Sequence, residues 1–169
     1  MNEIAKYYES TPEMLEQLPR GAFLSVRSGD KINTMTIGWG AIGCIWFKPV
    51  LMVMVRYTRY TYELMEKASE FSVCVPLDNN LKKELGVAGT KSGRDIDKFE
   101  ELSLTIGQGQ ATKAPVIDQC GQVYECRIVY KQAMDPEFLD PAIKEKYYAD
   151  DNYHVLYFGE IVACYKNNG

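Results

Sequence analysis

The segment from Lys31 to Thr61 limits the possible folds more than any other part of the chain, because it joins two strand-like runs to a cluster of cations and hydroxyls. Residues 32–39 alternate between two faces and include the β-branched side chains expected of a strand. Residues 51–55, L-M-V-M-V, are apolar at every position, which predicts a strand covered on both faces. This run ends at Arg56, and residues 62–68 then predict a short helix.

A polar corner lies between the second of these strands and the predicted helix. It contains Arg56, Thr58, Arg59 and Thr61. Guanidinium groups and the free N–H groups at a helix start both bind phosphate well, and threonine hydroxyls donate as well. The corner therefore predicts an anion site. A simpler alternative stays open, in which the arginines are solvated and Thr61 only caps the helix.

The rest of the chain contains further short strand-like segments at uneven spacing. They are residues 22–27, 71–76, 104–106, 115–117, 122–130 and 154–165. Helices are expected at residues 10–18 and 142–148 and after a cap at Asn79 or Asn80, and residues 95–102 are expected to be a helix or an irregular turn. Strands joined by hairpins and short helices favour a mainly β, antiparallel barrel, and no G-x-G-x-x-G motif supports a parallel Rossmann sheet.

Two of these segments, and the connection at residues 41–49, give more local expectations. Residues 122–130 alternate, with Tyr124 on one face and Glu125 on the other, which predicts a half-exposed strand. Residues 41–49 are expected to be a plain connection. Gly159 interrupts the last strand, where a bulge is expected.

Composition places the chain among globular proteins. Its 169 residues, 46% hydrophobic and 25% charged, suit one domain over residues 1–169, with residues 1–20 as a helical extension. The net charge of −4 and the lack of a basic face argue against a nucleic-acid partner. No apolar run is long enough for a membrane span and no signal peptide is evident, so a cytoplasmic location is expected.

Cysteine and histidine usage argues against a metal site. Five scattered cysteines without a C-x-x-C pair, together with a single histidine, offer no zinc-ligand spacing. We expect reduced thiols, mostly in the core. Cys44 lies in the connection after Trp39 and could approach a cofactor.

Five motifs occur in a fixed order along the chain. They are N-T-M-T-I-G-W (33–39), V-R-Y-T-R-Y-T-Y-E-L (55–64), E-F-S-V-C-V-P (70–76), G-T-K-S-G-R-D-I-D-K-F (89–99) and H-V-L-Y-F-G-E-I-V (154–162). In this order they resemble the flavin reductase-like family of FMN-binding split β-barrels, and within it the flavoredoxin branch. The resemblance covers residues 21–165. It implies an antiparallel Greek-key split barrel, a homodimer and FMN as cofactor.

The resemblance also implies a set of site residues. Flavin-ring contacts would come from Asn33, Met35, Thr36 and Trp39, mostly through backbone groups, and ribityl and phosphate contacts from Arg56, Thr58, Arg59, Thr61 and Lys91. His154 would lie near the flavin or the nicotinamide and orient the electron donor. From the residues alone, Met35 and Trp39 could equally be core, and His154 could be structural or exposed.

Three functions are compatible with this resemblance. The leading hypothesis is an FMN-dependent oxidoreductase that takes hydride from NAD(P)H and passes electrons to free flavin, a metal complex or another small acceptor. The alternatives are a flavoredoxin-like carrier that delivers electrons to a protein partner, and an FMN-binding module without turnover. The segment Ile37–Gly40 lacks the small polar residues that many members of the family carry around the tryptophan.

Overall fold

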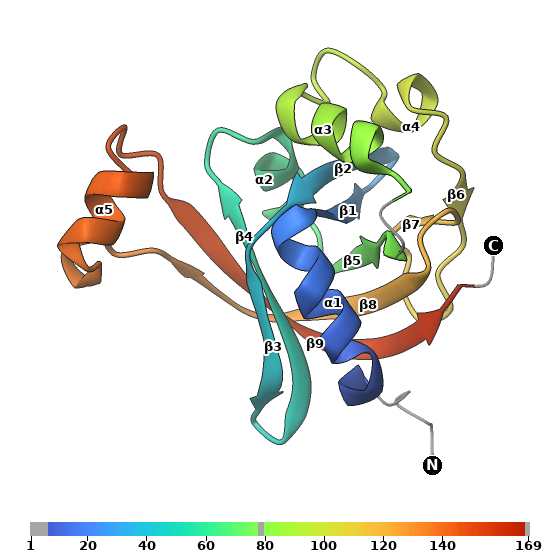
Figure 1. The fold of residues 1–169 in the computed structure, drawn as a ribbon, viewed down its shortest axis with the longest axis horizontal. Helices are drawn as coiled ribbons and strands as arrows, with labels where there is room; N and C mark the ends of the chain where they lie inside the picture. The colour runs from blue at the N-terminus through green and yellow to red at the C-terminus, as the bar shows by residue number, and fades with distance from the viewer. Residues whose placement is uncertain (1–6, 78–79, 168–169) are drawn as a thin grey trace.

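The computed structural model describes residues 7–77 and 80–167. Within these residues the main sheet has seven antiparallel strands in the order β2-β1-β5-β8-β9-β4-β3 (Figure 1). The strands are β1 (Ala22–Ser28), β2 (Lys31–Ile37), β3 (Gly40–Ile45), β4 (Lys48–Arg56), β5 (Glu70–Val75), β8 (Gln122–Ala133) and β9 (His154–Lys166). A separate two-stranded sheet pairs β6 (Ile106–Gly107) with β7 (Val116–Ile117), so β6 keeps only part of the strand expected at residues 104–106. The prediction of a mainly β, antiparallel fold is confirmed.

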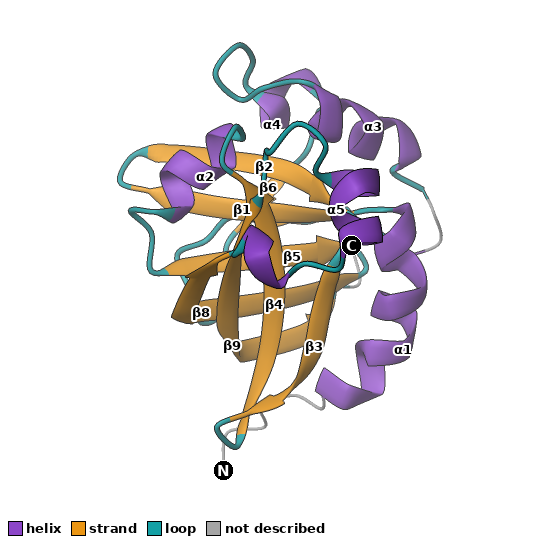
Figure 2. Cartoon of the chain, turned by 90° about the vertical axis from the view of Figure 1, so that its left-hand side faces the viewer, coloured by secondary structure: helices purple, strands orange, loops and turns teal. Residues whose placement is uncertain are grey.

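Short helices occupy the connections between the strands. They are α1 (Tyr7–Gln17), α2 (Tyr60–Met65), α3 (Lys82–Thr90), α4 (Lys98–Glu101) and α5 (Pro141–Tyr147), with 3-10 turns η1 at Leu18–Arg20 and η3 at Pro136–Phe138. Both α3 and α4 pack on β2 (Figure 2), whereas α5 lies apart from them, at the far end of the β8–β9 pair (Figure 1). Within the described ranges, no helix is both long enough and apolar enough to cross a bilayer.

The core has two parts, one on each side of β1 and β5. The main part includes Leu24, Val53, Phe71 and Tyr157, all fully buried. A smaller part lies beneath α3 and α4 and is built around Phe23. Successive residues of β1 therefore face different cores, which explains why this strand is almost continuously buried.

Strand β4 is fully buried on one face and partly covered on the other, so the prediction of a strand covered on both faces holds fully for one face only. Leu51, Val53 and Val55 are completely buried, but Met52 and Met54 on the opposite face are only partly covered. The apolar sequence of β4 did not reveal that its two faces differ in burial, because methionine occurs both in cores and in the walls of cavities. The methionine face of β4 therefore remains available for a pocket.

Strand β3 occupies most of the segment that was expected to be a connection. β2 ends at Ile37, Gly38 and Trp39 turn the chain, and β3 then pairs with β4 from Gly40 onward. A Cβ atom on Gly40 would lie 2.8 Å from the carbonyl oxygen of Met52, so only glycine permits this approach. Glycine has a low strand propensity, so the sequence of β3 did not predict a strand. Hydrogen bonding along β4 stabilises β3 instead.

The β3–β4 hairpin ends in an exposed aromatic turn. Trp46 and Phe47 both have positive φ angles, 55° and 56°, which is the backbone of a two-residue hairpin turn. Such angles are unusual for bulky side chains. Phe47 is fully exposed and Trp46 is 56% exposed, with its ring 6.3 Å from that of Tyr130.

The β8–β9 pair differs from its predicted pattern at Glu125, which is completely buried rather than on an exposed face. Its carboxylate accepts hydrogen bonds from the backbone N–H groups of Gln110, Ala111 and Thr112, so the loop before β7 folds over it. A register shift occurs beside Gly159, but its extra residue is Val129 on β8 and not a residue of the last strand, where the bulge was expected.

Two helix starts also differ from the predictions. α1 spans Tyr7–Gln17, so it starts before the expected residue 10, and Pro12 lies inside the helix. α3 follows Leu81, which has no side-chain capping bond, and Asn80 is therefore not the cap. Asn79 lies outside the described residues.

Candidate functional site

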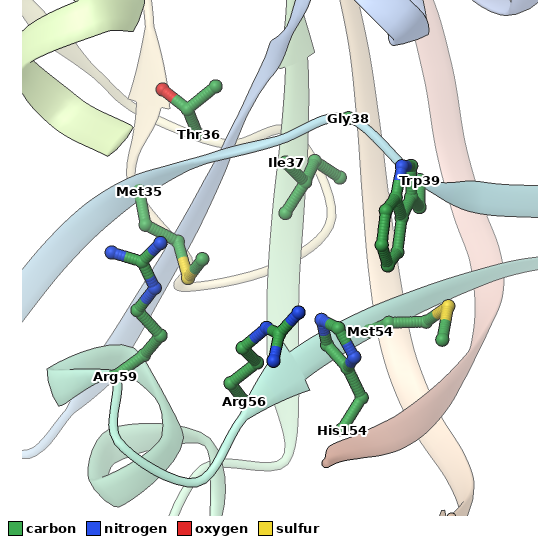
Figure 3. A pocket seen from close by; sticks show the side chains of 9 residues that line it. All are labelled: Met35, Thr36, Ile37, Gly38, Trp39, Met54, Arg56, Arg59 and His154. Carbon is green, nitrogen blue, oxygen red and sulfur yellow. The ribbon is translucent and has the colours of Figure 1, made fainter. Parts of the chain in front are cut away.

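Two adjoining pockets lie where β2, β4 and β9 meet the loops after β4 and α3. We call the first the tryptophan pocket; it is lined by Met35, Thr36, Ile37, Gly38, Trp39, Met54, Arg56, Arg59 and His154 (Figure 3). We call the second the cation pocket; it is lined by Asn33, Met35, Thr58, Arg59, Tyr60, Thr61, Thr90, Lys91, Ser92, Arg94 and Lys98. Met35 and Arg59 line both, so the two pockets are neighbours that share part of their walls.

The ten residues predicted for the site all line one of these pockets. Thr36, Trp39, Arg56 and His154 belong to the tryptophan pocket, and Asn33, Thr58, Thr61 and Lys91 belong to the cation pocket, with Met35 and Arg59 in both. Cys44 lines neither. The binding roles of these residues remain predictions.

The tryptophan pocket has flat and flexible apolar walls. Trp39 is 42% exposed at its rim, and its ring lies edge-on to Tyr147 at 5.1 Å. Met54 comes from the open face of β4 and completes the wall. The Thr36 side chain points away from this pocket, and its hydroxyl donates to the Leu85 carbonyl at 2.6 Å (Figure 3). Thr36 therefore offers only backbone groups to a ligand here.

His154 lies deep in the tryptophan pocket, directly across from Arg56 in the β4–β9 pairing. Only 8% of its surface is exposed. Burial, followed by the nearby positive charges of Arg56 and Arg59, lowers the pKa of His154 from 6.5 to about 4. The imidazole is therefore neutral at physiological pH and suits hydrogen bonding better than proton donation.

Arg56 is largely engaged by the segment that follows α5. Its guanidinium donates to the carbonyl oxygens of Asn152 and Tyr147, at 2.5 and 2.9 Å, and lies over the Tyr148 ring. The Asp150 carboxylate is 3.8 Å away. Arg56 thus fastens the α5 segment to β4 and lines the tryptophan pocket, and it is joined to Thr58 through Asn152.

The cation pocket contains four basic side chains, from Arg59, Lys91, Arg94 and Lys98. Two of them have acidic partners at the exposed rim, because Lys91 pairs with Glu101 and Arg94 with Glu63. Within the described residues, Arg59 and Lys98 form no ion pair with a carboxylate. The inner half of the pocket therefore has an uncompensated positive charge.

Arg59 and Lys98 are both held by the end of α3. Arg59 donates to the carbonyl oxygen of Gly89 at 2.9 Å, and the Lys98 ammonium donates to that of Ala88 at 2.7 Å. Lys98 is only 4% exposed, and burial, followed by the charge of Arg59, lowers its pKa from 10.5 to about 8. A buried ammonium without a counter-charge is costly unless an anion joins it.

The polar groups of the cation pocket are already ordered. The Asn33 amide donates to the Thr61 hydroxyl at 2.9 Å, and the Asn152 amide donates to the Thr58 hydroxyl at 2.9 Å. Gly93 lies so close to Asn33 that a Cβ atom there would collide with its side-chain oxygen. The loop after α3 thus closes on β2, and its glycine makes that contact possible.

Lys98, Arg94 and Met54 are site residues that the sequence interpretation did not assign. Lys98 and Arg94 lie in the G-T-K-S-G-R-D-I-D-K-F motif, so the motif itself contained the signal. Their pocket positions depend on how the loop folds back on β2, which spacing alone does not give. Within the described residues, no cluster of three potential metal-ligating side chains occurs.

The chemistry of the site fits FMN. A flat apolar ring requires walls such as Trp39 and Met54, and a phosphate requires cations such as Arg59 and Lys98. The buried ammonium of Lys98 carries most weight here, because a doubly charged anion would compensate for its burial. The site lacks carboxylates at the same inner position among the described residues.

Comparison by sequence assigns the chain to a family. Residues 16–169 match the family described as flavin reductase like domain. An uncharacterised protein of Archaeoglobus fulgidus is 39% identical over 118 residues, which are 69% of this chain and 65% of that protein. The alignment thus spans slightly less than two thirds of the relative's length.

Comparison with solved structures agrees with this family match. A flavoredoxin from Methanosarcina acetivorans superposes with a TM-score of 0.67 at 26% identity, over 88% of this chain and 68% of the other. An FMN-binding protein from Thermus thermophilus, with bound 1-cyclohex-2-enone, gives 0.69 at 22% identity, over 88% and 71%. A putative flavin reductase with a split barrel domain from Shewanella frigidimarina gives 0.69 at 15% identity, over 88% and 67%.

The split-barrel prediction is therefore confirmed. The same fold extends to an NADH:FAD oxidoreductase of Streptomyces globisporus, with a TM-score of 0.65 at 15% identity over 86% of this chain and 74% of the other. Likeness at this identity concerns the fold alone. Together with the family match over residues 16–169, these results give one conclusion: the chain belongs to the family of flavin reductase-like domains.

Proposed function

We propose that the protein binds FMN across both pockets and acts as an oxidoreductase that takes electrons from NADH or NADPH. The acceptor would be free flavin or another small molecule. One observation carries the proposal: the tryptophan and cation pockets share Met35 and Arg59. A ligand with a flat ring at one end and a phosphate at the other can therefore occupy both at once.

FMN, when bound, would supply the redox chemistry, and the protein supplies binding and orientation. Arg59, Lys98 and Lys91 would hold the phosphate. Trp39 and Met54 would cover the ring and keep water from it. His154, neutral and fixed by neighbouring groups, would orient a ligand by hydrogen bonding.

A second candidate is an electron carrier that keeps FMN bound and reduces a protein partner. The 26% identity to the Methanosarcina acetivorans flavoredoxin favours it. A module that binds FMN without turnover is the remaining alternative. All three candidates require bound FMN, so the cofactor is the first property to test.

The first experiment is to purify the protein without added cofactor and identify any bound yellow compound by mass spectrometry. The FMN-loaded protein is then mixed with NADH or NADPH in the absence of oxygen, and flavin absorbance is followed. Bleaching much faster than that of free FMN under the same conditions supports the oxidoreductase. Bleaching no faster than free FMN rejects the enzyme proposal and favours the carrier.

The proposal includes a homodimer in the cytoplasm, with no nucleic-acid or membrane partner. The exposed aromatic turn at Trp46 and Phe47, beside Tyr130, supports a protein contact at this end of the sheet. Sedimentation velocity should give a dimer, and Phe47→Ser should weaken it. A monomer that retains FMN would contradict this part of the proposal.

A further inference from the structure

Tyr148 and His154 form a buried hydrogen bond at the inner wall of the tryptophan pocket. The Tyr148 hydroxyl oxygen lies 2.8 Å from Nδ1 of His154. Tyr148 follows the last residue of α5 and is 2% exposed, so this bond brings the α5 segment to the site. The His154 ring lies between Arg56 and Trp39 (Figure 3).

Counting donors and acceptors determines where the histidine proton lies. A phenol has one proton to donate, and Nδ1 is the acceptor that the described residues provide for it. If Nδ1 carried the proton, the buried hydroxyl would have no acceptor, and a buried unpaired donor is unfavourable. The Tyr148 hydroxyl therefore donates to Nδ1, and the proton of the neutral ring is on Nε2.

The charges around the ring agree with a neutral imidazole. Arg56 from β4 and Arg59 from the following loop both face His154, and they disfavour a second proton on it. Asp150 lies near Arg56, 3.8 Å from its guanidinium, and partly offsets that charge. Arg56 also lies over the Tyr148 ring at 5.0 Å, a contact that favours donation by the phenol.

The other ring nitrogen is left for a ligand. Nε2 of His154 takes part in no hydrogen bond within residues 7–77 and 80–167, although the side chain lines the pocket. Its N–H is held in one direction, because Tyr148 fixes the opposite edge of the ring. A fixed donor of this kind selects a ligand that offers an acceptor atom at that point.

We propose that Tyr148 is a positioning residue that holds His154 as the neutral Nε2–H tautomer and thereby makes it a hydrogen-bond donor to an amide carbonyl oxygen. That oxygen belongs either to the pyrimidine ring of a flavin or to the carboxamide of a nicotinamide. The ligand half of the inference rests on the proposed function. The tautomer half does not, and it is tested on the protein alone.

The single histidine of the chain makes the test direct. In a protein with ¹⁵N-labelled histidine, long-range proton–nitrogen NMR spectra report which ring nitrogen is protonated. The expected result at neutral pH is one neutral Nε2–H tautomer. A proton on Nδ1, or a charged ring, would overturn the inference without any variant.

Two variants test whether the Tyr148 hydroxyl sets the His154 tautomer or whether Tyr148 has only a structural role. Tyr148→Phe keeps the ring but removes the donor, and the single tautomer should become a mixture. Tyr153→Phe is the matched control, because Tyr153 stacks on Tyr148 and its hydroxyl bonds to Asp151. Its spectrum should equal that of the wild type. An unchanged tautomer in Tyr148→Phe would overturn the role of Tyr148.

Adding FMN, and then tetrahydro-NAD, to the labelled protein identifies the ligand that accepts the hydrogen bond. If FMN alone shifts the Nε2–H proton resonance downfield, the acceptor is the flavin. If only FMN-loaded protein with tetrahydro-NAD, a nonreactive NADH analogue, gives the shift, the acceptor is the carboxamide. No shift in either sample, with FMN binding confirmed by fluorescence, overturns the donor role, whereas absent FMN binding contradicts the proposed function instead.

Discussion

The guanidinium of Arg59 donates a hydrogen bond to the carbonyl oxygen of Gly89 at 2.9 Å, which joins the loop after β4 to the end of α3. Arg59 thus stands between the two pockets with its direction already set. Replacing it by alanine should weaken FMN binding by about 1.5–3 kcal/mol, the usual scale for a hydrogen bond to a charged group. Quenching of flavin fluorescence measures the dissociation constant.

Arg27→Ala is the matched control for that experiment. Arg27 is an exposed arginine on β1 whose guanidinium donates to the Lys113 carbonyl, and it lines neither site pocket. Its replacement should leave FMN affinity unchanged. Equal losses in the two variants would count against an anion site at Arg59.

The buried ammonium of Lys98 predicts a pH dependence of binding. Its pKa in the free protein is about 8, so above that pH the anion must bind together with a proton. FMN affinity should therefore fall as pH rises through about 8. Lys98→Met should bind more weakly at neutral pH and lose this dependence, as titrations at several pH values would reveal.

Lys91→Met tests whether the dependence belongs to Lys98. Lys91 is exposed and pairs with Glu101 at 3.7 Å, and it reaches the same pocket. This variant should bind FMN more weakly at every pH but keep the wild-type profile. If its profile were flat instead, the assignment of the titrating group would be wrong.

His154 predicts a loss of stability in mild acid. Its pKa is about 4 in the folded protein and 6.5 in the unfolded chain, so the unfolded chain binds more protons between these values. The free energy of unfolding should fall as pH decreases from 6.5 to 4, by about 3 kcal/mol over the whole range. Denaturant titrations at several pH values measure the slope.

His154→Gln isolates this contribution, because other groups also titrate in acid. Glu66 and Glu160 have pKa values below 4.5, owing first to hydrogen bonds from Lys131 and Lys48, and they should destabilise both proteins alike at lower pH. The variant should show a shallower slope above that region. Identical slopes would mean that His154 is not protonated on unfolding as described.

Gly159 predicts a packing defect when a methyl group is added. A Cβ atom there would lie 2.5 Å from Cζ of Phe71 and 2.7 Å from Cβ of Cys126. Gly159→Ala should therefore destabilise the fold by about 1–3 kcal/mol, the range for overpacked cores. Gly43→Ala on β3, with no atom within 4 Å of the added Cβ, should be close to neutral in the same thermal-unfolding assay.

The sequence identified the strands with strong alternation or continuous apolar runs. β1, β5 and β9 match the predicted segments within one residue at each end, because β-branched and aromatic residues dominate them. β3 was missed, since its stability comes from pairing with β4 and not from its own residues. The burial of Glu125 was missed for a similar reason, as its partners lie in a loop more than a dozen positions earlier.

The sequence predicted which residues line the candidate site, but not how these residues are arranged in space. The motifs contained every residue that was assigned, and all of them line a pocket. Neighbours in sequence nevertheless have different partners: Arg56 donates to Tyr147 and Asn152, whereas Arg59 donates to Gly89. Local spacing does not contain that division, because it depends on where α5 and α3 pack.

The long β8–β9 pair carries α5 beyond the sheet (Figure 1), and the segment around α5 meets the pocket through Tyr147 and Tyr148 and through two carbonyl groups that bind Arg56. The residues that would select a ligand therefore include some outside the seven-stranded sheet that forms the core. Exchanging residues 135–151 for another sequence of matching length should alter which molecules approach His154, because it removes the buried Tyr148 that bonds to this histidine. Such a modular insertion offers a route by which one scaffold acquires new chemistry without being rebuilt.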